Sequence, residues 1–292
     1  MSDRAKPAGA APARGTAMTI EQRVTRHYTH GDLAAAVLEA LRAAGKDLDR
    51  LTLEDLAPID EFHVRGRAAT MELGANLDPI PAMQVLDVGS GIGGPSRHLA
   101  ALYGCRITGL DLSKEYCRVA TMLAERVGLS AQVSYRQGNA LAMPFDGGAF
   151  GAAYTQHVAM NIADKASLYA EVARVLGPGG RFGIYDLLQG EGGEVFYPVP
   201  WARTAADSFL VRPMELRALL EAAGFEILSW RDTTAAGREW FKEMRARQES
   251  GGQPRLGAHV LLGADFPAMV RSQVRNFAED RLAAVEVICR KP

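Results

Sequence analysis

The sequence has few of the features that mark disulfide-rich or membrane-spanning proteins. Its 292 residues include three cysteines, Cys105, Cys117 and Cys289, which are widely spaced and form no CxxC pair. An odd and sparse set of cysteines argues against a disulfide framework or a structural zinc site. It favours a reducing compartment, so we expect a cytoplasmic protein. No apolar run approaches the ~18 residues that a membrane-spanning helix needs.

An excess of either charge is also missing. The chain has 33 Lys and Arg against 34 Asp and Glu, a net charge of −1, which leaves no electrostatic footprint for nucleic acid or an anionic membrane. Residues 1–17 lack the apolar segment of a secretory signal and consist mainly of Ala, Pro and Arg. We expect them to form a disordered tail, with Met18 as an alternative start of the protein.

From residue 83 onward, short apolar runs alternate with amphipathic segments. This alternation predicts an α/β protein with a doubly wound, mostly parallel sheet and helices on both faces. Before it, helical spacing predicts helices over 20–28, 32–44 and 62–77, with a connector over 51–58. The predicted strands are 83–88, 105–110, 131–137, 149–155, 181–187, 225–230 and 281–289. Between them we predict one helix that ends at residue 103 and three further helices, over 114–127, 164–176 and 213–223.

Two stretches, 189–211 and 233–278, are longer than a simple strand–helix rhythm needs. The first contains the aromatic and proline-rich run FYPVPW, and the second contains two helical patches. Long insertions in a compact α/β domain usually serve as lids or binding loops. We therefore expect both to cover a binding site.

A glycine-rich loop follows the first strand and opens the next helix. Gly89, Gly91 and Gly94 fit the pattern GxGxxG, in which glycines let a ligand approach the backbone and the helix start supplies free N–H groups. Asp111 ends the second strand, where a carboxylate can accept both hydroxyls of a ribose. These features fit a dinucleotide-dependent oxidoreductase. Asp87, however, lies two residues before the first glycine and suits a ligand with a cationic amino-acid end better than a pyrophosphate.

Four segments together resemble a known family. VLDVGSGIGG, GLDLS, GNALAMPF and RVLGPGGR occur in the order and spacing of class I S-adenosylmethionine (SAM)-dependent methyltransferases. The closer resemblance is to the small-molecule "methyltransferase type 11" group, which includes sarcosine/dimethylglycine, tocopherol and quinone methyltransferases. It implies a Rossmann-like, seven-stranded sheet whose antiparallel last strand is inserted beside the sixth. It also implies SAM as methyl donor, S-adenosylhomocysteine (SAH) as product, a helical cap over 18–80 and a SAM-binding domain over 81–292 that carries both insertions.

The resemblance assigns five residues to the methionine part of the cofactor. Gly89, Ser90 and Gly91 would contact it from the loop, and Asp87 would lie close by. Gln156, after the fourth strand, would approach the methionine amine.

Five more residues are assigned to the remainder of the cofactor. Asp111 would bind the ribose, and Leu112 would pack on the adenine. Asn139 and Ala140 would meet the adenine edge. Many family members have Asp at the position of Asn139, but an Asn oxygen can still accept from the adenine amine. Tyr28, in RHYTHG, resembles an N-terminal tyrosine that covers the cofactor.

Two histidines are candidates for the chemistry. Methyl transfer from a sulfonium quenches charge, so the protein mainly aligns donor and acceptor and excludes water. His157 follows the fourth strand at the edge of the sheet where ligands bind, and it could serve the acceptor as a base or hydrogen-bond partner. It could instead only pack against the cofactor. His63, in DEFHVRG, resembles a histidine that faces the active site in close relatives; without the resemblance a solvated histidine would be expected.

The acceptor site is predicted from four further residues. Met160 and Asn161 would line the same wall as His157. Tyr197 and Trp201 could form an aromatic wall that favours a cationic amine, or could simply anchor the first insertion.

Other polar residues are weaker candidates. Arg203, Arg212 and Arg231 could bind an acceptor carboxylate, although such arginines are mostly surface groups. His27 and His30 could form a metal pair, but no acidic or cysteine cluster supports one and the displacement needs no metal. We therefore expect no metal site.

The function that these features predict is SAM-dependent methylation of a small molecule. The aromatic insertion favours an amine as acceptor, and the two histidines favour C- or O-methylation. A dinucleotide-dependent oxidoreductase and a catalytically silent SAM-binding protein remain as alternatives. We expect neither a nucleic-acid partner nor a membrane span, and the helices of the insertions could pair two copies into a homodimer.

Overall fold

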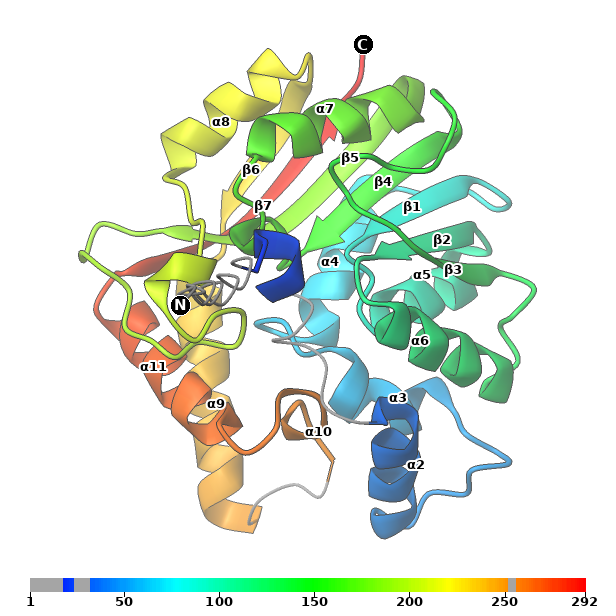
Figure 1. The fold of residues 1–292 in the computed structure, drawn as a ribbon, viewed down its shortest axis with the longest axis vertical. Helices are drawn as coiled ribbons and strands as arrows, with labels where there is room; N and C mark the ends of the chain where they lie inside the picture. The colour runs from blue at the N-terminus through cyan, green and yellow to red at the C-terminus, as the bar shows by residue number, and fades with distance from the viewer. Residues whose placement is uncertain (1–17, 24–31, 252–255) are drawn as a thin grey trace, which may run out of the picture.

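A seven-stranded sheet in the order β3-β2-β1-β4-β5-β7-β6 forms the centre of the computed structural model, which describes residues 18–23, 32–251 and 256–292 (Figure 1). Neighbouring strands are parallel except that β7 runs antiparallel to both β5 and β6. This confirms the predicted fold, including the inserted last strand. The strands are β1 (Gln84–Val88), β2 (Arg106–Asp111), β3 (Val133–Gln137), β4 (Phe150–Gln156), β5 (Leu176–Gln189), β6 (Glu226–Asp232) and β7 (Leu282–Arg290).

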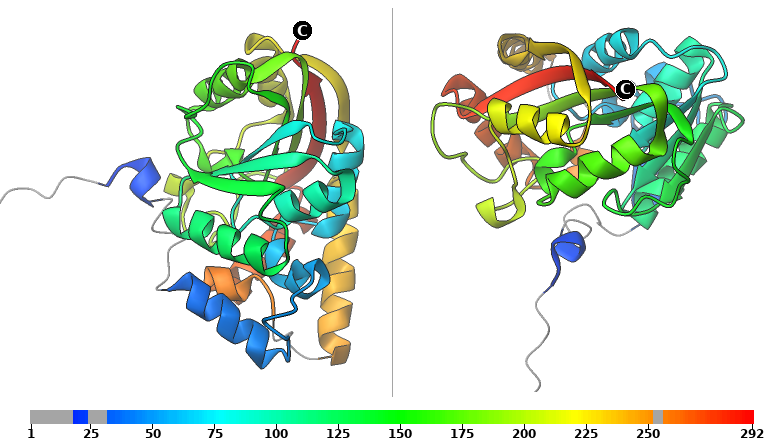
Figure 2. Two further views of the ribbon diagram at one scale, coloured as in Figure 1. Left: turned by 90° about the vertical axis from the view of Figure 1, so that its right-hand side faces the viewer. Right: turned by 90° about the horizontal axis from the view of Figure 1, so that it is seen from above.

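Helices cover both faces of this sheet, as the view from above shows (Figure 2). On one face, α7 (Lys165–Val175) and α8 (Pro213–Ala222) pack on a core that contains Leu86 and Val88 of β1. On the other, α4 (Arg67–Leu77) and α5 (Gly94–Tyr103) pack on Val85 of the same strand, with Ala124 of α6 (Lys114–Arg126) beside them. Because β1 is buried on both sides, Val85, Leu86 and Val88 are all apolar, and the acid between them, Asp87, is buried too.

The N-terminal region differs from its predicted pattern at two points. Residues 53–60 form the helix α3 (Leu53–Asp60) where a connector was predicted, because Thr52 caps it: the Thr52 hydroxyl accepts from the backbone N–H of Asp55 at 3.2 Å. The predicted helix over 62–77 begins only at α4, since Arg65 and Gly66 adopt positive φ angles of 67° and 49°. The loop 61–66 that results carries His63.

The helix α2 (Leu33–Ala43) starts close to its predicted position, with Asp32 as N-cap. Residues 20–23 are helical, and the remainder of the helix predicted over 20–28 lies outside the described residues. The expectations for residues 1–17, Tyr28, His27 and His30 also fall outside them.

The two insertions pack against each other and against the N-terminal helices. The second contains three helices where two patches were predicted: α9 (Thr234–Gly251), α10 (His259–Leu262) and α11 (Phe266–Ala278). Side chains of α10 and α11 share a hydrophobic cluster with α2 and α3, and Figure 1 shows α10 beside this N-terminal layer. The first insertion contains only the short helix η2 (Ala205–Asp207). It is joined to α11 by Asn276, whose side-chain amide accepts from Phe196 N at 2.8 Å and donates to Phe196 O at 2.9 Å.

Strand β5 is longer than predicted. It begins at Leu176, so the Gly-Pro-Gly-Gly run that was expected to precede it is part of the strand, and its pairing with β4 shifts between Phe150 and Ala152. Of the helices in the described ranges, none is long and apolar enough to cross a membrane.

Candidate active site

A cavity of about 270 Å³ lies at the carboxyl ends of β1, β2 and β4. We call it the main cavity. Its floor is the glycine loop 89–91, and its walls come from 110–113, 138–141 and 156–158. Ile20, Glu21 and Phe62 line it from the N-terminal side. In an open α/β sheet, ligands bind at this edge of the strands, and this is the edge at which the sequence motifs predict a cofactor.

The glycine loop is shaped by its neighbours. Gly89 has a φ of 78°, and a Cβ atom there would lie 2.3 Å from the Val158 side chain, so only glycine fits. Gly91 also has a positive φ, of 54°, but a Cβ there would meet nothing closer than Phe62 at 3.5 Å. Gly89 therefore permits close packing of the protein on itself, whereas Gly91 keeps the surface of the cavity open.

Asp111 ties this loop to the end of β2. Its Oδ2 accepts from Gly91 N at 2.9 Å, and its Oδ1 accepts from Ser113 N at 2.8 Å. Burial raises the pKa of this carboxyl to about 6, because desolvation disfavours the charged form. Asp111 also lines the main cavity, so a ligand that brings hydroxyl donors would stabilise its carboxylate.

A second buried acid, Asp87, reaches the same cavity from β1. The Ser96 hydroxyl donates to its Oδ2 at 2.5 Å, and burial raises the pKa of Asp87 to about 7. A cation bound beside this group would lower that pKa and favour the carboxylate.

The remaining residues predicted at the cofactor are distributed along the cavity. Ser90, Leu112, Asn139 and Ala140 all line it. One lone pair of the Asn139 Oδ1 accepts from Leu141 N at 2.9 Å, which fixes the orientation of the amide.

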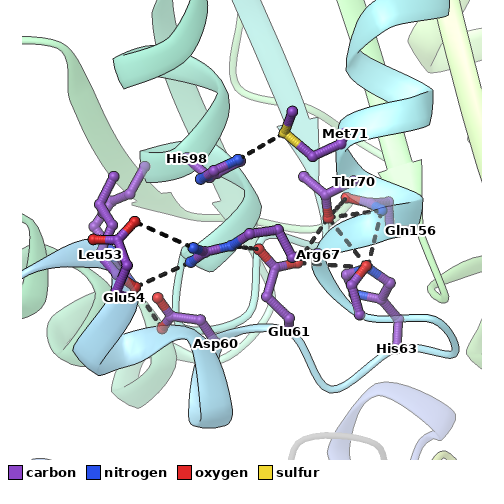
Figure 3. Close-up of polar contacts among 12 residues, drawn as sticks. Leu53, Glu54, Asp60, Glu61, His63, Arg67, Thr70, Met71, His98 and Gln156 are labelled. Atoms are coloured by element: carbon purple, nitrogen blue, oxygen red, sulfur yellow. Dashed lines mark hydrogen bonds and ion pairs between the residues drawn. The ribbon is translucent and has the colours of Figure 1, made fainter. Parts of the chain in front are cut away.

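Gln156 and His63 both line the main cavity and meet in a buried polar network (Figure 3). The His63 Nε2 lies 3.0 Å from Gly66 O and 3.2 Å from both Thr70 Oγ1 and Gln156 Nε2. Thr70 in turn donates to Glu61 Oε2 at 2.7 Å. Burial lowers the pKa of His63 to about 4, so the ring is neutral at pH 7. It is not the solvated histidine that the residues alone would suggest.

His157 occupies a strained position at the end of β4. Its φ is 55°, which is unusual for a residue other than glycine, and its backbone N–H donates to Tyr185 O at 2.8 Å. The ring stacks on Tyr185 with centroids 5.3 Å apart and meets His63 edge-on at 5.8 Å. Its Nε2 is buried and has no hydrogen-bond partner among the described residues. Burial, followed by the neighbouring His63, holds the pKa of His157 well below 6.5.

A smaller cavity of about 30 Å³ adjoins the main one. We call it the lid cavity. Phe62 and His157 belong to the lining of both, so these two rings separate the spaces. The lid cavity is lined by Phe62, His157, Met160, Pro200, Trp201 and Gln273.

The four residues predicted to line the acceptor site do not all lie in the same cavity. Met160 and Trp201 line the lid cavity. Asn161 lines the main cavity and also donates to Trp201 O at 2.7 Å, which holds the first insertion in place. Tyr197 lines neither cavity and packs in the hydrophobic cluster around Trp201.

Sequence reasoning missed several residues of the site. Phe62 is adjacent to the predicted His63, and Asp60 belongs to the same short motif, so both could have been inferred from it. Asp60 forms a fully buried ion pair with Arg97 at 2.7 Å, and Arg97 also donates to Ile92 O of the glycine loop at 2.8 Å. Gln273 gave no signal, because it is one polar residue in an amphipathic helix.

Comparisons with known proteins agree with this geometry. A family model described as "Methyltransferase domain" matches residues 86–184. The O-methyltransferase resE of Aspergillus sclerotiorum is 33% identical over 184 residues, which are 61% of this chain and 68% of that protein. The sterol 24-C-methyltransferase ERG6B of Gibberella zeae is 38% identical over 116 residues, 40% of this chain. That match spans only 30% of the length of the sterol enzyme.

Solved structures resemble nearly the whole chain. The [4+2]-cyclase SpnF has a TM-score of 0.68 and 23% identity over 94% of this chain and 96% of its own. Phosphoethanolamine N-methyltransferase 2 of Haemonchus contortus, in complex with SAM, has a TM-score of 0.71 and 20% identity over 95% of this chain and 61% of its own. At these identities the likeness establishes the fold. Together with the sequence matches, it shows that the chain belongs to the SAM-dependent methyltransferase family.

Proposed function

We propose that this protein transfers a methyl group from SAM to a small-molecule acceptor bound between the glycine loop and the two insertions. The observation that carries the proposal is the charge of the main cavity. Five carboxylates line it, and no Lys or Arg does so among the described residues. The lining acids are Glu21, Asp60, Asp87, Asp111 and Asp164.

This charge suits a cationic cofactor and opposes an anionic one. SAM carries a sulfonium and an ammonium group, and buried carboxylates favour both. Of the five acids, Asp60 is paired with the buried Arg97, and the other four would repel the pyrophosphate of a dinucleotide in their charged forms. The cavity therefore supports the methyltransferase hypothesis over the oxidoreductase alternative.

The residues present can hold SAM in the way that the sequence predicts. Asp111 would accept from the ribose hydroxyls, and Gly91 would allow the methionine part to approach the backbone. Asp87 and Gln156 would face the amino group. When bound, SAM supplies an electrophilic methyl group, and the task of the chain is to align an acceptor with it and exclude water.

His157 is suited to act on the acceptor. It stands at the boundary between the two cavities, and its Nε2 is buried without a partner among the described residues. Because its pKa is low, the imidazole is neutral at pH 7 and can accept a hydrogen bond or a proton. We propose that His157 contacts the reacting atom, and that His63 positions Gln156 and the edge of the His157 ring.

The covering segments complete the proposal. We infer that residues 18–80 form a cap over the cofactor and that the insertions 189–211 and 233–278 form lids over the acceptor. We also propose a homodimer, which light scattering would test. The buried, unpaired state of all three cysteines supports a reducing, cytoplasmic environment.

Calorimetry and turnover together test the function. SAH should bind with a micromolar or tighter dissociation constant, and NAD should not bind. Incubation with SAM carrying a deuterated methyl group should label an acceptor from a metabolite extract, as read by mass spectrometry. Binding of NAD without SAH would overturn the proposal. Binding of SAH without labelling of any acceptor would favour the silent SAM-binding protein.

A further inference from the structure

The lid cavity differs from the main cavity in having no charged side chain. Four of its six lining residues, Phe62, Met160, Pro200 and Trp201, are apolar. The polar side chains are His157, which is neutral at pH 7, and Gln273. A charged acceptor group in this space would lose its hydration without gaining an opposite charge.

The arginines that could have served an acidic acceptor are engaged elsewhere. Arg203 pairs with Asp265 on the surface. Arg212 pairs with Glu191 at 3.2 Å, and Arg231 pairs with Glu286 at 3.0 Å. None of these arginines lines either cavity.

The boundary of the lid cavity offers a hydrogen-bond acceptor and therefore calls for a ligand that donates. The Nε2 of His157 is buried without a partner among the described residues, and its strained backbone holds it at the boundary of the two cavities. If this nitrogen is unprotonated, it needs a donor. A hydroxyl group supplies one without carrying a charge. The similarity to an O-methyltransferase over 61% of the chain points to the same acceptor atom.

We propose that the acceptor is an uncharged, mainly apolar molecule that presents a hydroxyl group to His157 Nε2 at the boundary of the two cavities, with an apolar part that reaches into the lid cavity against Trp201 and Phe62. This inference rests on the proposed function. In the transfer, the acceptor oxygen forms a bond to the methyl carbon as the carbon–sulfur bond breaks. The hydroxyl proton passes to His157 Nε2, and the sulfonium becomes a neutral thioether.

A trio of probes separates this acceptor class from the alternatives. p-Ethylphenol is neutral, p-hydroxyphenylpropionate is anionic and phenylethylamine is cationic at pH 7. Each is titrated into the SAH-bound protein and followed by ligand-observed NMR, which reads binding without turnover. The neutral phenol should bind at least about tenfold more tightly than either charged probe, because a charged group would lose its hydration in this site without gaining an opposite charge.

His157→Asn should weaken binding of the phenol by about tenfold while leaving SAH affinity within a few-fold of the parent, since the shorter asparagine cannot place an acceptor at the position of Nε2. Arg212→Gln is the matched control and should change neither value. A selective loss of the anionic probe in Arg212→Gln would instead assign that arginine to the acceptor.

The outcomes distinguish the inference from the function on which it rests. Three results would each overturn the proposed acceptor class without affecting the conclusion that the protein binds SAM. They are binding of a charged probe as tight as that of the phenol or tighter, no phenol binding to the SAH-bound protein, and an unchanged phenol affinity in His157→Asn. A failure of SAH itself to bind would overturn the proposed function.

Discussion

The two cavities are built in different ways, although they share the rings of Phe62 and His157. The floor of the main cavity is the backbone of the glycine loop 89–91, and Asp111 beside it is held by the N–H groups of Gly91 and Ser113. The lid cavity is formed by side chains from four segments that are distant in sequence. Backbone geometry can be encoded by a short local motif, whereas a wall assembled from distant side chains can change one residue at a time. This difference is what we expect if related enzymes share one methyl donor and differ in the molecule that they methylate.

The comparison predicts the largest effect for a side chain that enters the main cavity. Gly91→Val should lower SAH affinity by ~100-fold or more, because its branched side chain would occupy the open surface beside Phe62. Gly104→Val is the matched control, since Gly104 also has a positive φ, of 66°, but faces away from the cavity. Both variants should lose ~1–2 kcal/mol of stability from the left-handed backbone. Calorimetry would contradict the site if the two variants bound SAH equally well.

At the boundary of the two cavities, turnover and cofactor binding should separate. His157→Ala should lower turnover by ~10²-fold while leaving SAH affinity within a few-fold, if His157 is a general base. His259→Ala, on α10, is the control. Because burial lowers the pKa of His157, the acidic limb of the parent pH–rate profile should fall below the ordinary value of 6.5 and vanish in the variant. Loss of SAH binding in place of turnover would make His157 a cofactor-packing residue.

Within the main cavity, Asp111→Ala should weaken SAM binding by at least tenfold, since each charge-assisted bond to a ribose hydroxyl contributes about 1.5–3 kcal/mol. The variant should also loosen the glycine loop, because Gly91 N loses its acceptor. Asp111→Asn retains one oxygen acceptor and should show a smaller loss. A change of less than twofold in Asp111→Ala would show that β2 does not end at the ribose.

The acids of the main cavity should also make cofactor binding depend on pH. Burial raises the pKa of Asp87 to about 7 and that of Asp111 to about 6, so both are protonated at low pH in the free protein. A cationic ligand favours their ionised forms, and binding should therefore release protons. SAM affinity should fall by up to about tenfold per pH unit below about pH 7 through Asp87, and by up to a further tenfold per unit below about pH 6 through Asp111. A flat affinity between pH 5 and 8, or no buffer dependence of the calorimetric enthalpy, would argue against this coupling.

The smallest effect is expected on the outer surface of the insertions. Arg203→Ala removes an ion pair with Asp265 whose two side chains are about half exposed. Such pairs contribute ~0–1 kcal/mol, so stability and turnover should change little. A large loss of turnover in this variant would mean that the arginine has a part in the acceptor site after all.

The same contrast explains what could be predicted from sequence. Six of the seven strands were predicted within two residues, because short apolar runs between glycines have few other interpretations, whereas β5 begins five residues before its predicted start. Many of the predicted cofactor residues that line the main cavity came from three short motifs, in 85–94, 109–113 and 138–145, whereas Phe62 and Asp60 were missed. α3 was missed because Pro58 obscured a helix that Thr52 and Asp55 had marked. Phe62 was assigned to a helix because apolar spacing does not reveal the positive φ angles at 65 and 66.

The acceptor side was less predictable for a physical reason. Gln273 reaches the lid cavity only because α11 packs against α9 and the start of β7, and no pattern within α11 marks that contact. Tyr197 and Trp201 belong to one short motif and look equivalent in sequence. Only Trp201 lines the cavity, while Tyr197 packs beside it in the supporting cluster.

The buried amide of Asn276 has a consequence for how this enzyme could be altered. Because it pairs with both the N–H and the carbonyl of Phe196, it joins two segments of chain at a single point with no solvent to replace it. Since the partner is backbone, a replacement for residues 189–211 keeps this joint as long as it follows the same course at position 196 and has no proline there. A replacement of different length would leave two backbone groups and one buried amide unmatched, so insertions that change length are expected to transfer between relatives only together with α11.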